Sequence, residues 1–281
     1  MALPDGFDLK EFVRRVLAED LGAGGDVTSA ATIAEDARFN AEMNARQAII
    51  VAGIEIAAAF FRELDAEAVI DLLVKDGDRV EHGATLMRIS GKARAMLTAE
   101  RSALNTLQHL SGIATLTRDY VEAIAGTGTI LLDTRKTLPG LRLLEKYAAL
   151  MGGAQNHRMR LDDGVLIKDN HVAMCDGVAE AVRRARSAST GLQVQVEVDR
   201  IDQIEPALAA GAERLLLDNM DPAQLREAMK LVAGRVPLEA SGGVTLETIR
   251  FLAETGVDFI SVGRITQSAP AVDVGLDYSF V

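Results

Sequence analysis

The chain has 281 residues, 48% hydrophobic and 25% charged, which is the composition of a globular protein, and its formal net charge of −11 argues against nucleic acid as a partner. Its single cysteine, Cys175, excludes a disulfide framework and a cysteine-based zinc cluster. Because there is no apolar run of membrane-spanning length and no apolar signal core near the N-terminus, we expect a cytoplasmic protein without a membrane partner.

The first part of the chain mixes helices and strands irregularly. Apolar residues at helical spacing predict helices over residues 7–19, 54–64 and 99–116. Short apolar runs predict strands over residues 49–51, 70–74 and 85–89.

After residue 125 the pattern becomes regular, with short apolar runs that alternate with helical stretches. The runs predict strands over residues 130–132, 165–167, 194–198, 215–217, 236–238 and 259–262. The stretches between them predict helices over residues 141–151, 178–188, 202–210, 223–232 and 246–255. Such alternation is typical of βα units around a buried parallel sheet, and six units indicate a barrel with fewer than eight strands.

Each predicted strand of this second part ends in a polar or glycine residue. In chain order these residues are Asp133, Lys168, Glu197, Asp218, Ser241 and Gly263. Because the active site of a βα barrel gathers at the carboxyl ends of its strands, we expect them around one rim.

Cations in the same part of the chain come from three separate places. Arg135 and Lys136 follow the strand end at Asp133, Arg158 follows a glycine pair, and Lys168 ends the next strand. Convergent cations indicate a polyanionic ligand, because Arg grips carboxylates bidentately and Lys binds phosphate as a point charge. In contrast, we expect Arg142, Glu145 and Lys146 to form a solvated helix face.

Two strand-end carboxylates, Glu197 and Asp218, could hold Mg²⁺ that bridges substrate phosphates. They could equally form ion pairs with Lys168 without a metal, and both possibilities stay open. The four histidines lack the spacing of a zinc site.

Glycine-rich turns follow the last two predicted strands. Ser241-Gly242-Gly243 precedes a predicted helix, and Gly263 follows the next strand. The loops after late barrel strands often hold a phosphate on backbone N–H groups, so a phosphate site is favoured over two ordinary tight turns.

Several motifs together resemble one known family. The segments DTRKTLPGLR (133–142), NHR (156–158) and LIKDNH (166–171) resemble quinolinate phosphoribosyltransferase. LAEDLGAGGDVTS (17–29) and AERSALNTLQHLSGIAT (99–115) resemble its N-terminal motifs. The resemblance implies a type II phosphoribosyltransferase fold, an N-terminal α/β sandwich followed by an incomplete, seven-stranded α/β barrel. We therefore expect domains at 1–112 and 113–268, with the tail 269–281 on the N-terminal domain.

The resemblance also implies a reaction, in which quinolinate and phosphoribosyl pyrophosphate (PRPP) give nicotinate mononucleotide, pyrophosphate and CO2 with Mg²⁺ as cofactor. The residues that it places on quinolinate are Arg101, Arg135, His157, Arg158 and Lys168. It assigns Lys136 and Lys168 to PRPP, and Glu197 and Asp218 to the ribose and Mg²⁺. It assigns the 5-phosphate to Ser241, Gly242, Gly243 and Gly263, with Gln267 in the last loop.

In this family the enzyme is a homodimer, in some members a hexamer of dimers, and Arg101 would reach the partner subunit's site. The chain departs from the usual pattern at Ala154, Arg264 and Gln267, where the family often has a glycine, a small residue and a histidine.

Three other functions are compatible with this pattern. A homologue associated with molybdenum transport shares the motifs, but it typically has an aromatic residue in place of Lys168. Nicotinate phosphoribosyltransferase would need to bind one carboxylate only. A phosphate-ligand sensor would not need both Glu197 and Asp218.

Overall fold

The computed structural model describes residues 3–188 and 191–279, which form two compact units. Unit 1 consists of Met1–Leu116, Leu143–Gly152 and Ser268–Val281, and unit 2 of Thr117–Arg142 and Gly153–Gln267. The domain limits expected after residues 112 and 268 refer to parts of the chain that fold independently. They stay a prediction. None of the described helices is both long and apolar enough to cross a membrane.

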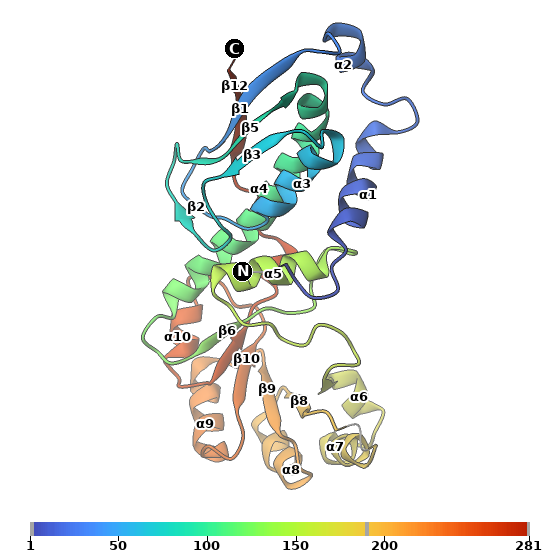
Figure 1. Ribbon diagram of the computed structural model, residues 1–281. Coiled ribbons are helices and arrows are strands. Elements are labelled where there is room, and N and C mark those ends of the chain that lie inside the picture. The colour runs from blue at the N-terminus through green and yellow to red at the C-terminus, as the bar shows by residue number, and fades with distance from the viewer. Residues whose placement is uncertain (1–2, 189–190, 280–281) are drawn as a thin grey trace. The chain divides into compact units, whose positions relative to one another are not determined.

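Unit 1 is built on an antiparallel sheet with the strand order β12-β1-β5-β3 (Figure 1). Its strands are β1 (Arg38–Ala45), β3 (Val69–Leu72), β5 (Thr85–Lys92) and β12 (Val274–Ser279), and a separate pair consists of β2 (Ile49–Ile50) and β4 (Arg79–Val80). The sequence analysis did not predict β1 and β12. The final strand pairs with β1 from Asn40–Ser279 to Ala45–Val274, so the C-terminal segment belongs to this sheet.

Helices bury an apolar face in unit 1. They are α1 (Leu9–Leu21), α2 (Val27–Thr32), α3 (Ile54–Leu64), α4 (Ala93–Ala123), which continues into unit 2, and α5 (Arg142–Gly152). Asp8 and Asp26 cap α1 and α2 by accepting from the backbone N–H of Glu11 and Ser29, which is why those helices begin there. Phe60 and Phe61 of α3 are fully buried.

The expectation of a solvated face at residues 142–146 is wrong. Glu145 and Lys146 are both completely buried on α5, and Glu145 lies 2.9 Å from Nε2 of His109 on α4. Charged side chains are buried only with partners, so helical spacing of charges did not indicate exposure here.

Unit 2 contains a parallel sheet with the strand order β6-β11-β10-β9-β8-β7. Its strands are β6 (Ile130–Leu132), β7 (Val165–Ile167), β8 (Val194–Val198), β9 (Arg214–Asp218), β10 (Leu238–Ser241) and β11 (Phe259–Ser261). The strand predicted over 236–238 begins at Leu238 instead. The described residues thus form six strands here instead of the expected seven, and beyond β6 Leu132 forms an isolated parallel bridge with Gln155. Among the described residues neither edge pairs with the other, so the barrel is incomplete.

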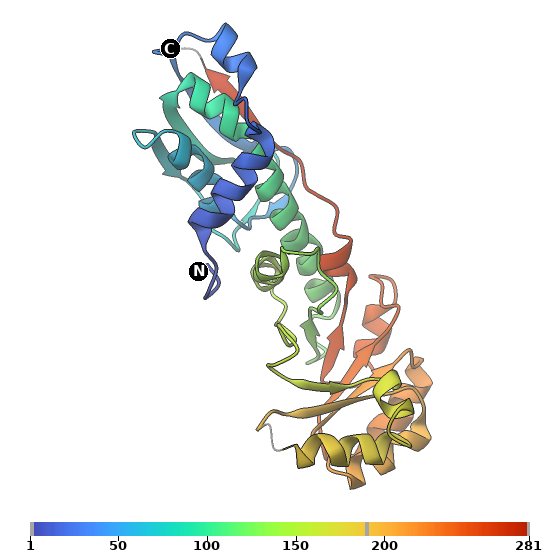
Figure 2. The same ribbon diagram turned by 90° about the vertical axis from the view of Figure 1, so that its right-hand side faces the viewer.

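Helices α7 (Val178–Ser187), α8 (Ile204–Ala209), α9 (Pro222–Val232) and α10 (Ile249–Ala253) pack in sequence along the outside of this sheet (Figures 1 and 2). The short helices α6 (Asp169–Ala173) and α11 (Arg264–Gln267) and the 3-10 turn Ile201–Gln203 follow strand ends. Because neighbouring strands of this sheet run parallel, their carboxyl ends lie at one edge of the sheet.

Candidate active site

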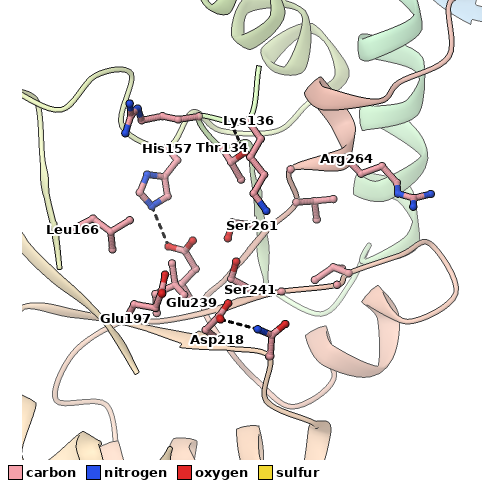
Figure 3. A pocket seen from close by; sticks show the side chains of 18 of the residues that line it. Thr134, Lys136, His157, Leu166, Glu197, Asp218, Glu239, Ser241, Ser261 and Arg264 are labelled. Carbon is pink, nitrogen blue, oxygen red and sulfur yellow. Dashed lines mark hydrogen bonds and ion pairs between the residues drawn. The ribbon is translucent and has the colours of Figure 1, made fainter. Parts of the chain in front are cut away.

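The carboxyl ends of the parallel strands surround a cavity of about 660 Å³ in unit 2 (Figure 3). Most of the predicted site residues line this cavity: Arg135, Lys136, His157, Arg158, Lys168, Glu197, Asp218, Ser241, Gly242, Gly243, Gly263 and Gln267. Further lining residues that the sequence analysis did not single out for a role include Thr134, Asn219, Glu239, Thr245, Ser261 and Arg264. Parallel strands therefore bring together polar groups that are up to about 130 residues apart.

Cations converge on the cavity from two loops. Burial lowers the pKa of Arg158, and the positive charge of Arg135 lowers it further, so the two guanidinium groups lie close enough to repel each other. The Arg158 guanidinium is held by a 2.8 Å hydrogen bond that its Nη1 donates to the carbonyl of Gly164. Two adjacent guanidinium groups form a strong site for an anion with more than one carboxylate.

Lys168 and Glu197 form an ion pair across the cavity mouth, with Nζ and Oε2 2.9 Å apart. The lysine side chain is 49% exposed, so solvent or an incoming anion can reach it. The ion pair that the sequence allowed between Glu197 and Lys168 is thus present, and Mg²⁺ binding by Glu197 stays a prediction.

Asp218 ends β9 and points into the same space as Glu197 and Lys136 (Figure 3). Burial raises the pKa of Asp218, the negative charge of Glu197 raises it further, and Lys168 and Lys136 partly oppose this shift. The site therefore concentrates negative charge beside a group of cations.

His157 is fixed by contacts on both ring nitrogens. Its Nδ1 accepts a 2.7 Å hydrogen bond from the backbone N–H of Arg158, so the neutral ring carries its proton on Nε2. That nitrogen lies 3.5 Å from Oε2 of Glu239. The ring is thus oriented as part of the cavity wall.

Glu239 is the main functional candidate that the sequence analysis missed. It is completely buried on β10, and its Oε2 accepts from Arg214 at 2.7 Å and from Gln195 at 2.8 Å. Burial alone would raise the pKa of Glu239, but hydrogen bonding to His157 and the positive charge of Arg214 outweigh it and lower the pKa. The available signal in the sequence was a charged residue inside an apolar strand. The same signal had pointed to Glu197.

Asp133 does not lie on the rim, contrary to the expectation from its strand end. It is completely buried, and its carboxylate accepts from the backbone N–H of His157 at 2.8 Å and from the side-chain amide of Asn156. Its role is to order the loop that carries His157 and Arg158.

The glycines of the site differ in what they allow. Gly263 lies against Lys136, where an added Cβ would come within 2.6 Å of Lys136 Cδ. Gly243 has φ +60° and open space around it, which leaves its backbone accessible to a ligand. Gly242 has φ +97° and packs against Asn219.

Arg101 is the predicted site residue that is not among the residues lining this cavity. It is exposed on α4 in unit 1 and does not line the cavity of unit 2.

The donor atoms fit Mg²⁺ better than zinc. No three His, Cys, Asp or Glu side chains of the described residues are grouped as metal ligands. Mg²⁺ is usually held by one or two carboxylates together with substrate phosphates and water, and Glu197 and Asp218 offer such a pair in the cavity.

An incomplete α/β barrel with strand-end cations, paired carboxylates and glycine-rich late turns defines a type II phosphoribosyltransferase. The comparisons with known proteins specify the family. Residues 26–111 and 113–277 match the N-terminal and C-terminal domain models of quinolinate phosphoribosyl transferase, and the chain belongs to this family.

Curated relatives and solved structures agree with this family. A nicotinate-nucleotide pyrophosphorylase [carboxylating] of Mycobacterium leprae is 42% identical over 95% of this chain and 96% of its own length. A probable member of the same name from Bacillus subtilis is 41% identical over 96% of this chain and 93% of its own. The structure of the Francisella tularensis nicotinate-nucleotide pyrophosphorylase is 39% identical with a TM-score of 0.93, and covers 99% of this chain and 100% of that chain.

Proposed function

We propose that this protein transfers the phosphoribosyl group of PRPP to quinolinate and removes one carboxylate, forming nicotinate mononucleotide, pyrophosphate and CO2 for NAD biosynthesis. The observation that carries the proposal is the cavity at the strand ends, where Arg135, Arg158 and Lys168 converge near Glu197 and Asp218. The carboxylating pyrophosphorylases to which the chain is similar bear the name of the reverse of this reaction.

The cations bind the dicarboxylate. Arg135 and Arg158 offer forked N–H donors that match planar carboxylates, and Lys168 supplies a point charge next to them. This set favours quinolinate over nicotinate, because a monocarboxylate would leave one of the two guanidinium groups without a counter-charge. His157 accepts a hydrogen bond from the backbone N–H of Arg158, and the carbonyl of Gly164 holds the guanidinium in place.

The carboxylates serve the ribose of PRPP. When the bond between the anomeric carbon and pyrophosphate breaks, positive charge develops on the ribose ring, and the negative charges of Glu197 and Asp218 stabilise it. Lys136 lies between the cavity and the turn at Gly263, where it can offset the charge of the departing pyrophosphate. Backbone N–H groups of the Ser241-Gly242-Gly243 turn and of Gly263, with Gln267, hold the 5-phosphate.

Glu197 and Asp218 would also hold Mg²⁺. The ion supplies further positive charge against the pyrophosphate oxygens when it is bound. A cation would relieve the repulsion between these carboxylates that raises the pKa of Asp218.

The pyridine nitrogen of quinolinate attacks the anomeric carbon as pyrophosphate leaves, so one C–N bond forms and one C–O bond breaks. The ring nitrogen becomes positively charged. When the 2-carboxylate departs as CO2, its bonding electron pair stays on the ring carbon beside this charge and then takes a proton from water. Positioning of the two substrates supplies much of the acceleration, and no protein nucleophile is required.

We further propose a cytoplasmic homodimer in which Arg101 completes the quinolinate site of the partner subunit. The exposed position of this arginine on α4 supports the proposal, since its side chain is accessible to a second chain.

The test is a comparison of substrates. Purified protein is incubated with PRPP and Mg²⁺ and with either quinolinate or nicotinate, and mononucleotide is measured by chromatography. We expect product from quinolinate only. Equal rates with nicotinate would refute the role of the convergent cations, and no product from either would refute the function.

A further inference from the structure

The residue after Asp218 has an unusual backbone. Asn219 adopts φ +55°, a left-handed conformation that is uncommon outside glycine and that Asn tolerates better than most residues. Its backbone N–H donates a 2.9 Å hydrogen bond to the carbonyl of Ser241 on the neighbouring strand β10. The position is therefore fixed between two strand ends of the cavity.

The Asn219 side chain makes contact in two directions. Its Nδ2 donates a 2.7 Å hydrogen bond to Oδ2 of Asp218, drawn as a dashed line in Figure 3. On its other side it packs against Gly242 so closely that a Cβ there would come within 2.1 Å of Asn219 Oδ1 and 2.6 Å of Cγ. Because Gly242 has no Cβ, the side-chain amide of Asn219 fits beside it. This packing role is separate from any contact that the Gly242 backbone makes with a ligand.

We propose that Asn219 is a positioning residue that fixes the Asp218 carboxylate relative to the Gly242 turn, and thereby couples the ribose end of the PRPP site to its 5-phosphate end. The inference rests on the proposed function. Asp218 and Glu197 line the same cavity, so a donor beside the Asp218 carboxylate helps to fix its position. Lys168 is paired with Glu197, which leaves the amide of Asn219 as a direct donor to Asp218.

Two substitutions distinguish the role of the Asn219 side-chain amide from the role of its backbone conformation. Asn219→Gly keeps the left-handed conformation at little steric cost but removes the amide. Asn219→Asp keeps the shape of the side chain but replaces the donor with a second carboxylate facing Asp218. Ala233→Gly is a matched control, because Ala233 has φ +51° at the end of α9 and is not part of the cavity lining.

The experiment measures binding of PRPP with Mg²⁺ by calorimetry, together with KM for each substrate and the melting temperature. For Asn219→Gly we expect PRPP binding about tenfold weaker, as for the loss of one hydrogen bond to a charged group, with KM for quinolinate nearly unchanged. Asn219→Asp should lose more, and Ala233→Gly should bind PRPP as the wild type does.

Unchanged PRPP binding in either Asn219 variant would overturn the inference while the proposed function stood. Equal loss for PRPP and quinolinate would also overturn it, because it would indicate a general structural defect. If the wild-type protein itself does not bind PRPP, the proposed function fails, and this inference fails with it.

Discussion

At the scale of single residues, the site contains positively and negatively charged side chains whose burial costs free energy. Asp218 is held beside Glu197 although the contact is unfavourable, whereas Glu239 is buried among partners that favour its charge. These two carboxylates should therefore respond to substitution in opposite directions.

Asp218→Asn should stabilise the folded protein while it abolishes PRPP binding. The folded state raises the pKa of Asp218, so its ionisation opposes folding once the pH exceeds the ordinary value near 3.8. We expect a melting temperature higher by about 2 °C at pH 7. The gain should shrink as the pH falls towards 3.8, and a lower melting temperature at pH 7 would contradict this account.

Glu239→Gln should destabilise the protein strongly. It leaves Arg214, whose side chain is only 15% exposed, without its fully buried counter-charge, a loss of about 3 kcal/mol in the free energy of unfolding. A lowered pKa means that this stabilisation is present above the ordinary value near 4.5 and is lost as the pH falls through the folded value. Denaturant unfolding at pH 7 and below pH 4 measures both effects.

The control is Glu205→Gln, which removes an exposed carboxylate paired with Arg235. Surface ion pairs contribute little, so this variant should unfold like the wild type. If both variants lost equal stability, the buried network around Glu239 would not have the proposed importance.

At the scale of elements, the regular βα pattern after residue 125 predicted the parallel sheet well, because buried parallel strands are continuous apolar runs. The sequence analysis missed β1, whose buried positions Phe39, Ala41, Met43 and Ala45 alternate with polar residues. Two of the four are alanines, so the alternation has little hydrophobic contrast. It also missed β12, because that strand is specified by pairing with β1 and not by its own pattern.

The same distinction applies to the site. Strand ends predicted most of the cavity, since topology alone brings them together. Asn219, Glu239 and the buried role of Asp133 depend on particular side-chain hydrogen bonds, and these contacts leave no periodic signal in the sequence.

Gly112→Ala should destabilise unit 1 although alanine is the better helix former. Gly112 lies inside α4, and an added Cβ would come within 2.2 Å of the carbonyl oxygen of Pro270. That clash would displace the segment leading into β12, so we expect a melting temperature lower by several degrees, against a helix-propensity gain of about 1 kcal/mol. Gly24→Ala is the control, because the space around Gly24 is open. A more stable Gly112→Ala protein would contradict this packing.

At the scale of the whole molecule, each active site of the proposed dimer takes residues from two chains. Arg101 and Lys168 of one site belong to different subunits. Arg101→Ala and Lys168→Ala should each be nearly inactive alone. Mixed after co-refolding, they should regain up to about a quarter of wild-type activity, because half of the dimers are heterodimers and each of these has one intact site. Mixtures that stay inactive would contradict the shared site, provided that both variants remain dimeric by light scattering.

The central claim is decarboxylating phosphoribosyl transfer, and the most direct measurement follows the carboxylate itself. Quinolinate labelled in its 2-carboxylate is incubated with the protein, PRPP and Mg²⁺, and labelled CO2 and nicotinate mononucleotide are measured together. The account predicts equal amounts of the two products, and none of either without PRPP. Mononucleotide without CO2, or CO2 release without PRPP, would contradict it.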